Sequence, residues 1–469
     1  MQPRTVPFFL IHHKKKTMKT NSFLAIIAFA FSSLFMMTSC FNSASNKEQN
    51  TTATNHFTLP ALLQRTGELS TAEDWQKTQD AANRVTQKID QEPQDFSSYI
   101  KLSEIYINEA RVTGEHGYYY PSILNMLDYV LTNKLNEDIR FKALSLKSSV
   151  YLSLHQFAKA KETATQAVAI NPDNAQIYGA LVDANVELGN YEEAVKMAEI
   201  MMNKRPDLLS YSRASYLREI HGDPKGAIEA MKMATESGYP GYENEAWTRT
   251  TLGHIYETYG DIQSAEREYR QTLEERPGYP FAIAGLASVE LKKGNAKEAE
   301  EKLKQAINII PEVSFYVDLA KIYKQTGREQ EAQSTFSDIL DMMADDEAKG
   351  HTMALEYAKI YMTIGNDLFK ALEYAKKEYD VRPTNIDVNK VMAEIFYKTG
   401  NQQEAEKHLA LAFATNSKNP ELQNIAGSIY IKSGQITAGE MLLKKAHEAN
   451  PYLNPINMRD QNIAMTFRK

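Results

Sequence analysis

Apolar residues recur at helical spacing in short segments that each lead to a glycine. Leu252, Ile255 and Tyr256 precede Gly260 in this way, and other glycines follow similar segments. Residues three and four positions apart lie on one face of an α-helix, so each segment predicts an amphipathic helix. Glycine accepts the left-handed backbone conformation that ends a helix tightly. The pattern therefore predicts helices that stop at regularly placed glycines.

These glycines define a repeating unit. They are separated by 33 to 38 residues and stand at positions 189, 222, 260, 294, 327, 365, 400 and 434. An alanine follows most of them after five residues, and a proline ends many units. We expect the alanine where two helices cross closely, and the proline just after the second helix, because proline cannot continue a helix. An earlier unit has His155 in place of the glycine and keeps Ala160 and Pro172.

Each unit is therefore predicted to be a hairpin of two helices. Two helices cannot bury their apolar faces alone, so neighbouring hairpins must stack. We predict an all-α superhelical solenoid of nine to ten antiparallel helix hairpins over residues 96–453. Residues 58–95, whose apolar residues include Trp75 and Ile89, are predicted to form N-terminal capping helices, and residues 454–469 a C-terminal tail.

One unit closely resembles the tetratricopeptide repeat (TPR) family. It contains most of that family's motif, in the form Leu252, Gly253, Tyr256, Gly260, Ala265, Tyr269 and Pro277. A narrower resemblance, carried by Arg205–Tyr211 and Gly278–Pro280, is to a bacterial TPR-array family of uncharacterised function. The resemblance implies a superhelix in which the first helix of each hairpin lines a concave groove. It also implies that this groove binds a protein or peptide.

One stripe of the first helices is expected to face that groove. Its candidate ligand-binding residues are Asp183, Tyr216, Glu219, Trp247, His254, Glu257, Lys321, Lys324, Lys359 and Lys390. The middle of the stripe is aromatic and acidic, and its C-terminal part is basic. We therefore expect an extended or helical ligand with aromatic contacts at its centre and an acidic portion near the lysines. The alternative is that the stripe is only a solvated helix face.

Three units lack the aromatic residue that most units have four positions before the glycine. Asn185, Arg218 and Glu290 stand there instead. A polar group in a packed seam costs on the order of 1–3 kcal/mol unless it is hydrogen-bonded. We expect these three residues to be buried, with Asn185 and Arg218 in one shared network. The alternative is that they reach into the groove.

The N-terminus has the features of a targeting signal. Residues 23–37 form an apolar run that is too short to span a bilayer comfortably, and basic residues precede it. We predict a signal peptide over residues 1–39, with translation starting at Met1 or at Met18. The sequence Met37-Thr38-Ser39-Cys40 resembles the bacterial lipobox, which implies that Cys40 receives an acyl lipid such as palmitate. Residues 40–57 would then be the lipidated cysteine and a flexible tether. The alternative is a simple cleaved signal beside an uninvolved cysteine.

Charge and motif content narrow the function. The formal net charge is -7 although the first 39 residues carry only basic charges, so a nucleic acid would be repelled. Cys40 is the single cysteine, which excludes an intramolecular disulfide. No phosphate-binding loop, nucleophile elbow or zinc-protease motif is present. His254 and Glu257 form only half of a carboxylate metal arrangement. We expect no catalytic residue, no metal and no cofactor.

These observations together predict a non-enzymatic scaffold that binds a protein or peptide and is held at a membrane by its lipid. We expect it in the bacterial cell envelope, on the periplasmic face of the outer membrane. Two alternatives remain: a lipoprotein that captures a solute or glycan, and an accessory subunit of an envelope enzyme complex.

Overall fold

The computed structural model describes residues 59–71 and 73–453. The predicted signal peptide (1–39), Met18, Cys40, the tether and the tail (454–469) lie outside these residues. The described part contains helices and no strand. None of its helices has the length and apolar content needed to cross a bilayer. The all-α prediction is confirmed within this range.

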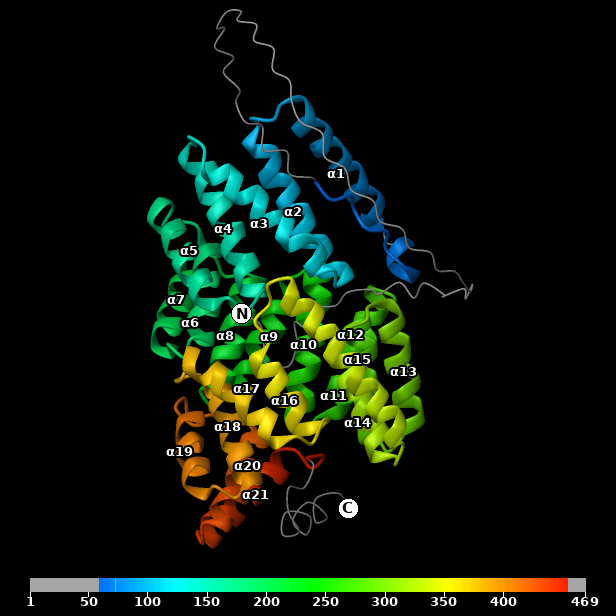
Figure 1. The fold of residues 1–469 in the computed structure, drawn as a ribbon, viewed down its shortest axis with the longest axis vertical. Helices are drawn as coiled ribbons and strands as arrows, with labels where there is room; N and C mark the ends of the chain where they lie inside the picture. Colours follow the sequence, from blue (N-terminus) through cyan, green and yellow to red (C-terminus); the bar gives the residue numbers. More distant parts are fainter. Residues whose placement is uncertain (1–58, 72, 454–469) are drawn as a thin grey trace, which may run out of the picture. The chain divides into compact units, whose positions relative to one another are not determined.

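Ten consecutive helix hairpins make up the array, and we number them 1 to 10 in chain order (Figure 1). Their first and second helices are, in turn, α2 (Phe96–Thr113) and α3 (His116–Leu131), α4 (Glu137–Ser153) and α5 (Phe157–Ile170), α6 (Ala175–Glu187) and α7 (Tyr191–Lys204), α8 (Leu208–Ile220) and α9 (Pro224–Glu236), α10 (Glu243–Thr258) and α11 (Ile262–Glu275), α12 (Pro280–Lys292) and α13 (Ala296–Ile309), α14 (Val313–Gln325) and α15 (Glu329–Ala348), α16 (Ala354–Thr363) and α17 (Leu368–Val381), α18 (Ile386–Thr399) and α19 (Gln402–Ala412), and α20 (Pro420–Lys432) and α21 (Ile436–Ala449).

The turn inside most hairpins has one common closure. The predicted glycines 189, 222, 260, 294, 327, 400 and 434 have φ between +72° and +89°, and His155 has φ of +56°. The next backbone N–H then donates to the carbonyl five positions earlier, as from Asp261 to Tyr256 at 2.9 Å. This bond satisfies a carbonyl that the end of the helix would leave unpaired. The glycine spacing therefore located these turns correctly.

Hairpin 8 differs from this prediction. Its left-handed residue is Asn366, with φ of +50°, and Gly365 was the wrong assignment. The closing bond runs from the Asp367 N–H to the Tyr361 carbonyl at 2.9 Å, so the turn contains one more residue. Asparagine tolerates the left-handed region better than most residues. Gly365 instead lies against Phe336, whose ring would be 2.7 Å from an added Cβ.

The alanine and proline positions are confirmed by the packing. The alanines at 160, 194, 227, 265, 299, 371 and 405 are fully buried where the two helices of a hairpin cross. Helix α7 ends at Lys204, and Arg205 then takes an extended conformation before Pro206, with φ of -154° and ψ of 94°. A residue before proline is pushed out of the helical region because the proline ring collides with it.

Successive hairpins pack so that their first helices lie on the inside of a curve. Helix α4 contacts α6, α6 contacts α8, and α10 contacts α12, whereas second helices of neighbouring hairpins make no comparable contacts in the described range. Closer spacing on one side of a stack bends the stack toward that side. We call the side formed by the first helices the inner face.

A short segment covers the beginning of the array. It comprises residues 59–66, the 3₁₀-helix η1 (Gly67–Thr71) and α1 (Glu73–Gln91), which packs on α2. The Arg65 guanidinium pairs with the buried Glu109 carboxylate at 2.5 Å and lies 4.9 Å from the Trp75 ring centre. Main-chain groups of residues 60–63 bond to tyrosine hydroxyls of hairpin 1.

The early hairpins also contact the late hairpins directly. The Asn385 side chain, in the linker after α17, donates to the Glu187 carbonyl at the end of α6 at 2.9 Å. The turn of each of the first five hairpins touches the linker that follows the hairpin five positions later. Bonded residues are 192 to 198 positions apart along the chain. We call this set of contacts the seam.

The seam is made of hydrogen bonds, one ion pair and close backbone approaches. The Thr352 N–H donates to the Leu154 carbonyl at 3.1 Å. The Arg382 guanidinium pairs with Glu187 at 2.5 Å, and the Ile386 N–H donates to the Tyr191 hydroxyl at 2.7 Å. The remaining contacts place Gly114 against Ile310, Gly222 against Asn416, and Asn450 against Glu257 and Thr258.

The space around each turn glycine shows which turns belong to the seam. A Cβ added at Gly222 would lie 2.6 Å from the Asn416 carbonyl oxygen, closer than real Cβ atoms approach such groups. In contrast, a Cβ added at Gly294, Gly327, Gly400 or Gly434 would have no neighbour within 4 Å. Turns of the first half are therefore covered, and those of the second half are open.

Two carboxyl groups near the seam have raised pKa values. Asp346, on the last turn of α15, is fully buried, and neither of its carboxyl oxygens has a hydrogen-bond partner in the described residues. Burial raises the pKa of Asp346 to about 8, and the nearby Asp345 carboxylate adds to the shift. Burial also raises the pKa of Glu115, in the turn of hairpin 1, to about 7. Asp346 is therefore mostly protonated at neutral pH, and Glu115 is about half protonated.

Candidate ligand-binding surface

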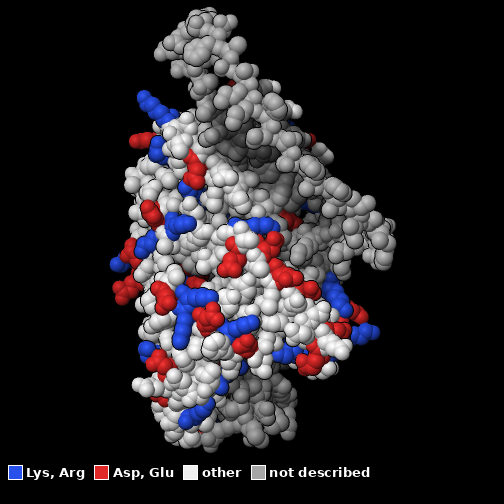
Figure 2. All heavy atoms as spheres, in the orientation of Figure 1, with Lys and Arg blue, Asp and Glu red and all other residues white. Residues whose placement is uncertain are grey.

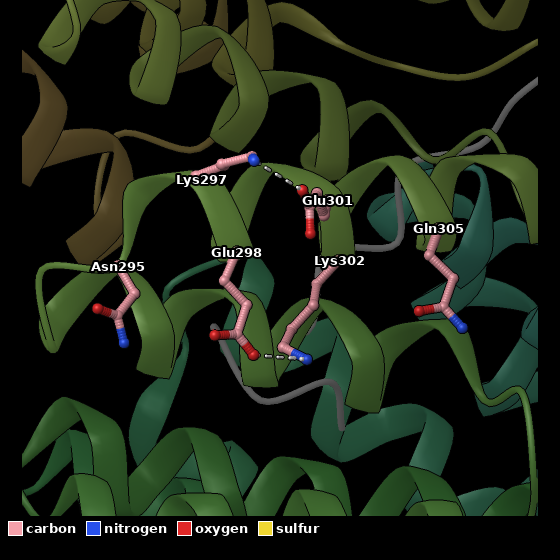
Figure 3. A pocket seen from close by; sticks show the side chains of 6 residues that line it. All are labelled: Asn295, Lys297, Glu298, Glu301, Lys302 and Gln305. Carbon is pink, nitrogen blue, oxygen red and sulfur yellow. Dashed lines mark ion pairs between the residues drawn. The ribbon is translucent and has the colours of Figure 1, made fainter.

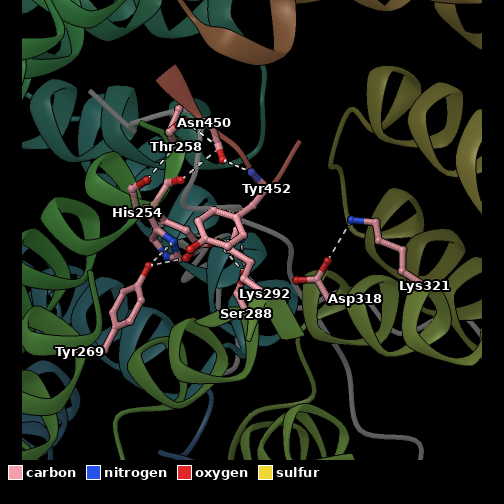
Figure 4. A network of polar contacts seen from close by, with 10 residues as sticks. His254, Thr258, Tyr269, Ser288, Lys292, Asp318, Lys321, Asn450 and Tyr452 are labelled. Carbon is pink, nitrogen blue, oxygen red and sulfur yellow. Dashed lines mark hydrogen bonds and ion pairs between the residues drawn. The ribbon is translucent and has the colours of Figure 1, made fainter. Parts of the chain in front are cut away.

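The inner face carries a connected polar network where α10, α11 and α12 meet (Figure 4). Its centre is Tyr269 of α11, whose ring passes between the backbones of two first helices. A Cβ at Gly253 or Gly285 would lie 2.4 Å or 2.6 Å from that ring. Two glycines inside helices are unfavourable for helix stability, at roughly 1 kcal/mol each. Here they leave the space that lets Tyr269 reach the inner face.

The Tyr269 hydroxyl joins His254 to Glu257. It lies 2.9 Å from the Glu257 carboxylate and 2.9 Å from Nδ1 of His254. Because the hydroxyl has one proton and donates it to Glu257, its oxygen accepts from a protonated Nδ1. Burial lowers the pKa of His254, so the ring is neutral at pH 7. Nε2 of His254 is then a hydrogen-bond acceptor.

Glu257 is held in its ionised form. Burial alone would raise its pKa, but the Lys292 ammonium outweighs burial and keeps the pKa of Glu257 below its ordinary value. The Lys292 ammonium is 2.5 Å from the carboxylate, and the Ser288 hydroxyl also donates to it. The site thus contains a fixed carboxylate whose negative charge is largely compensated by the Lys292 ammonium of α12.

The face of α10 next to this network has unmet hydrogen-bonding capacity. Trp247, Thr250 and His254 are three and four positions apart, so they share one face of the helix. The indole Nε1 of Trp247 and the hydroxyl oxygen of Thr250 are buried and have no hydrogen-bond partner in the described residues. We call Trp247, Thr250, His254 and Glu257 the α10 surface. Along it lie an N–H donor, a hydroxyl, an imidazole acceptor and a carboxylate.

An ion pair on α14 lies across from the α10 surface (Figure 4). Asp318 and Lys321 are 2.9 Å apart, and both side chains are about half exposed. Asp318 is close enough to act electrostatically on His254. The aromatic residue Phe281 of α12 packs edge-on against Phe315 of α14. The predicted mixture of aromatic and acidic residues is therefore brought together at hairpins 5 to 7.

Other predicted groove residues in hairpins 3 and 4 have internal roles. Asp183 forms a two-point ion pair with Arg213, which fits because Gly179 leaves space for the guanidinium. Tyr216 and Glu219 are buried, with 2% and 4% of their surface exposed. Tyr216 packs in the core between hairpins 3 and 4. Tyr216 and Glu219 therefore do not present an open surface.

The predicted lysine group is mostly engaged within the chain. Lys324 donates to the carbonyls of Thr363 and Ile364 at the end of α16, at 3.3 and 2.9 Å. Lys321 pairs with Asp318, and Lys390 pairs with Glu421 of the next hairpin. Lys359 is half-buried and has no ion pair in the described residues. These contacts weaken the expectation of an acidic ligand portion here, because most of the positive charge is already compensated.

The three polar residues before the turns do not form the expected shared network. Arg218 is exposed and pairs with Asp223 at 3.3 Å, so its predicted burial was wrong. Asn185 and Glu290 are buried, and each bonds the asparagine five positions later. In all three hairpins the polar side chain thus reaches across the turn to the first residues of the second helix. The role of these residues is local.

A hollow lies against α13, lined by Asn295, Lys297, Glu298, Glu301, Lys302 and Gln305, all from that helix or its first turn (Figure 3). Two ion pairs, Lys297 with Glu301 and Lys302 with Glu298, occupy it. On the face drawn in Figure 2, charges of both signs are interspersed. Within the described residues, no three histidine, cysteine or acidic side chains are arranged to hold a metal ion.

The partners of the candidate residues were not identified from sequence. Arg213, Tyr269 and Lys292 complete the inner-face contacts, and none was selected as a functional residue. A signal was present for Tyr269: the glycines 253 and 285 interrupt otherwise favourable helices and flag a close approach. The positions of Arg213 and Lys292 depend on how adjacent hairpins rotate, which the repeat pattern does not specify.

Comparison with protein families finds the same repeat. Models described as tetratricopeptide repeats match residues 151–218 and 313–343. A TPR repeat-containing protein of Methanocaldococcus jannaschii is 22% identical over 372 residues, which are 78% of this chain and 59% of that protein. A CTR9 homolog of Arabidopsis thaliana is 23% identical over 44% of this chain and 19% of its own length. The chain therefore spans less than two thirds of these relatives.

Solved structures resemble the fold. Human IFIT1, determined as a dimer with PPP-AAAA, is 13% identical, with 82% of this chain and 97% of IFIT1 covered and a TM-score of 0.41. PilW, a type IV pilus biogenesis factor, is 16% identical over 44% of this chain and 93% of PilW, with a TM-score of 0.36. We draw nothing about function from these likenesses. The ten stacked hairpins and the matches to the repeat models show that this chain is an all-α superhelix of tetratricopeptide repeats.

Proposed function

We propose that this protein is a non-enzymatic scaffold that binds an extended protein segment on the α10 surface. The observation that supports this most directly is an unpartnered polar atom, Trp247 Nε1, on a half-buried residue of the predicted stripe. More than nine in ten buried polar groups in folded proteins are hydrogen-bonded. Each unmade bond costs about 1–3 kcal/mol, which a suitable ligand recovers.

An extended peptide has the chemistry that these groups require. Its main chain offers carbonyl acceptors and N–H donors in alternation, about 3.3 Å apart per residue. The Trp247 indole can donate to a carbonyl, and Nε2 of His254 can accept from an N–H. Helix α10 places these two groups roughly 10 Å apart, because each residue rises about 1.5 Å. This length corresponds to about three residues of an extended ligand.

The neighbouring residues would select among peptides by side chain. Trp247 and Phe281 provide aromatic surface, which is enriched among the residues that dominate binding energy. The Asp318 side chain is half exposed, so its carboxylate can also pair with a basic residue of the ligand, whereas the Glu257 carboxylate is mostly covered and paired with Lys292. A segment with an apolar residue flanked by arginine or lysine fits this surface best.

Site-specific photo-crosslinking in cells would test this proposal. A photoreactive phenylalanine replaces Trp247 in one strain and Phe369 in another. Phe369, on α17, is 81% exposed and is therefore the matched control. We expect a crosslinked protein from position 247 and not from position 369. Equal products from both positions, or none from position 247, would refute binding at the α10 surface.

We further propose that a lipid on Cys40 holds the array at the periplasmic face of the bacterial outer membrane. Support comes from the lipobox-like segment before Cys40 and from the absence of any other cysteine in the sequence. Metabolic labelling with a clickable palmitate analogue should label the wild type and leave Cys40→Ser unlabelled. Density-gradient separation of the two membranes then tests the location. Equal labelling of both proteins would refute the lipid anchor.

A further inference from the structure

The chain that leaves the last helix is fixed next to the α10 surface. The Asn450 side-chain amide donates to the carbonyls of Glu257 and Thr258 at 3.3 and 3.1 Å. Pro451 lies against Gly260, where an added Cβ would be 3.0 Å from the proline ring. The Tyr452 N–H is bonded to the Asn450 side-chain oxygen at 2.9 Å. These contacts direct the chain toward hairpin 5 and away from α21.

Tyr452 continues in the same direction. It is half-buried, and its side chain points toward the polar network of His254 and Lys292 in Figure 4. The segment 454–469 therefore begins beside the proposed ligand-binding surface. A chain of this length reaches roughly 50 Å when extended, at about 3.3 Å per residue, so the whole α10 surface is within its range.

The composition of this segment matches the surface. It has three basic residues, Arg459, Arg468 and Lys469, against the single acidic residue Asp460. It also has five large apolar residues: Ile456, Met458, Ile463, Met465 and Phe467. The surface offers the half-exposed carboxylate of Asp318 beside the aromatic residues Trp247 and Phe281. This is the combination of charge and apolar side chains expected of a ligand under the proposed function.

We propose that residues 454–469 occupy the α10 surface as a tethered ligand and compete with the external partner. The inference rests on the proposed function of that surface. A segment joined covalently to the array beside its binding surface has an effective concentration there on the order of 1 mM. If the free segment binds with a dissociation constant of about 0.1 mM, the tether weakens an external ligand about tenfold. The protein would then bind a partner only when that partner outcompetes the tail.

Fluorescence anisotropy with a labelled synthetic peptide of residues 454–469 tests the competition. Three proteins are compared: the full chain, the full chain carrying Ile463→Asp and Phe467→Asp, and a chain ending at Leu453. We expect saturable binding by the second and third proteins, and about tenfold weaker binding by the first. Trp247→Ala in the doubly substituted chain should abolish binding, whereas Lys297→Glu on α13 should leave it unchanged. Circular dichroism confirms that each variant is folded.

Two results would overturn the inference: no binding to any of the three proteins at 1 mM peptide, or equal binding to all three. The photo-crosslinking experiment separates this inference from the proposed function. If position 247 still crosslinks a cellular protein while the peptide fails to bind, the surface is a binding site and the tail is not its ligand. If both experiments fail, the proposed function and the inference fall together.

Discussion

Replacing Arg382 with alanine gives the sharpest test of the seam. The Arg382 side chain is 5% exposed, pairs with Glu187 across the seam at 2.5 Å and also pairs with Glu378 of its own helix. Its guanidinium lies 4.9 Å from the centre of the Phe157 ring of hairpin 2. Without Arg382, the Glu378 carboxylate, 4% exposed, remains buried without its cation. Breaking a buried pair in this way costs about 3–5 kcal/mol.

Replacing Glu187 should be milder, because its side chain is 30% exposed and Arg382 keeps its pair with Glu378. We expect Glu187→Ala to cost about 1–2 kcal/mol, in the range for a hydrogen bond to a charged group. The double variant should cost less than the sum of the two single changes, since both remove the same contact.

Urea denaturation and amide hydrogen exchange measure these effects together. The Ile386 N–H bonds the Tyr191 hydroxyl across the seam, so it reports local opening near Arg382. The Thr352 N–H, bonded to Leu154, reports the neighbouring seam contact. In Arg382→Ala we expect Ile386 to exchange first and Thr352 to be less affected. If Arg382→Ala lowers the free energy of unfolding by less than about 1 kcal/mol and leaves exchange at Ile386 unchanged, Arg382 does not stabilise the seam at this point.

Two further predictions follow from the buried groups and the turn glycines. Asp346→Asn should remove a pH dependence of stability, because burial raises the folded-state pKa of Asp346 to about 8. The stabilisation from the proton on Asp346 is complete below about pH 4. It declines by about 1.4 kcal/mol per pH unit up to about pH 8. Between pH 5 and pH 7, the free energy of unfolding from urea titrations should fall by about 3 kcal/mol more in the wild type than in Asp346→Asn. Asp341 is exposed, so Asp341→Asn is the control and should behave like the wild type. Parallel curves for all three proteins would refute the assignment. Gly222→Ala should lower the free energy of unfolding by several kcal/mol more than Gly434→Ala. Both glycines have positive φ, but only a Cβ added at Gly222 would collide with the linker. Equal melting temperatures of the two variants would show that the turn at Gly222 is not covered.

The repeat was predictable from the sequence because its features depend on residues that are close together in the chain. The conformation of Gly260, the burial of Ala265 and the extended residue before Pro277 each depend on neighbours within one hairpin. The hairpin assignments were correct for that reason. Gly365 was assigned incorrectly because an asparagine follows it, and either residue can adopt the left-handed conformation.

The seam could not be predicted in the same way. Its contacts join residues nearly two hundred positions apart, and their pairing depends on a small rotation between hairpins that accumulates over five units. The expected burial of Arg218 failed for a related reason: its position suggested a packed aromatic site, but its long side chain reaches solvent and pairs with Asp223. The α10 surface was located in part, since Trp247, His254 and Glu257 were selected and their partner Tyr269 was not.

The seam also sets how the array responds to tension. An ordinary stack of helical hairpins behaves like a spring, because small changes at every joint let it lengthen gradually. Here, stretching must first separate turn from linker at five places, including the Arg382–Glu187 pair. The protein should therefore resist small forces stiffly and then yield in steps as individual contacts give way.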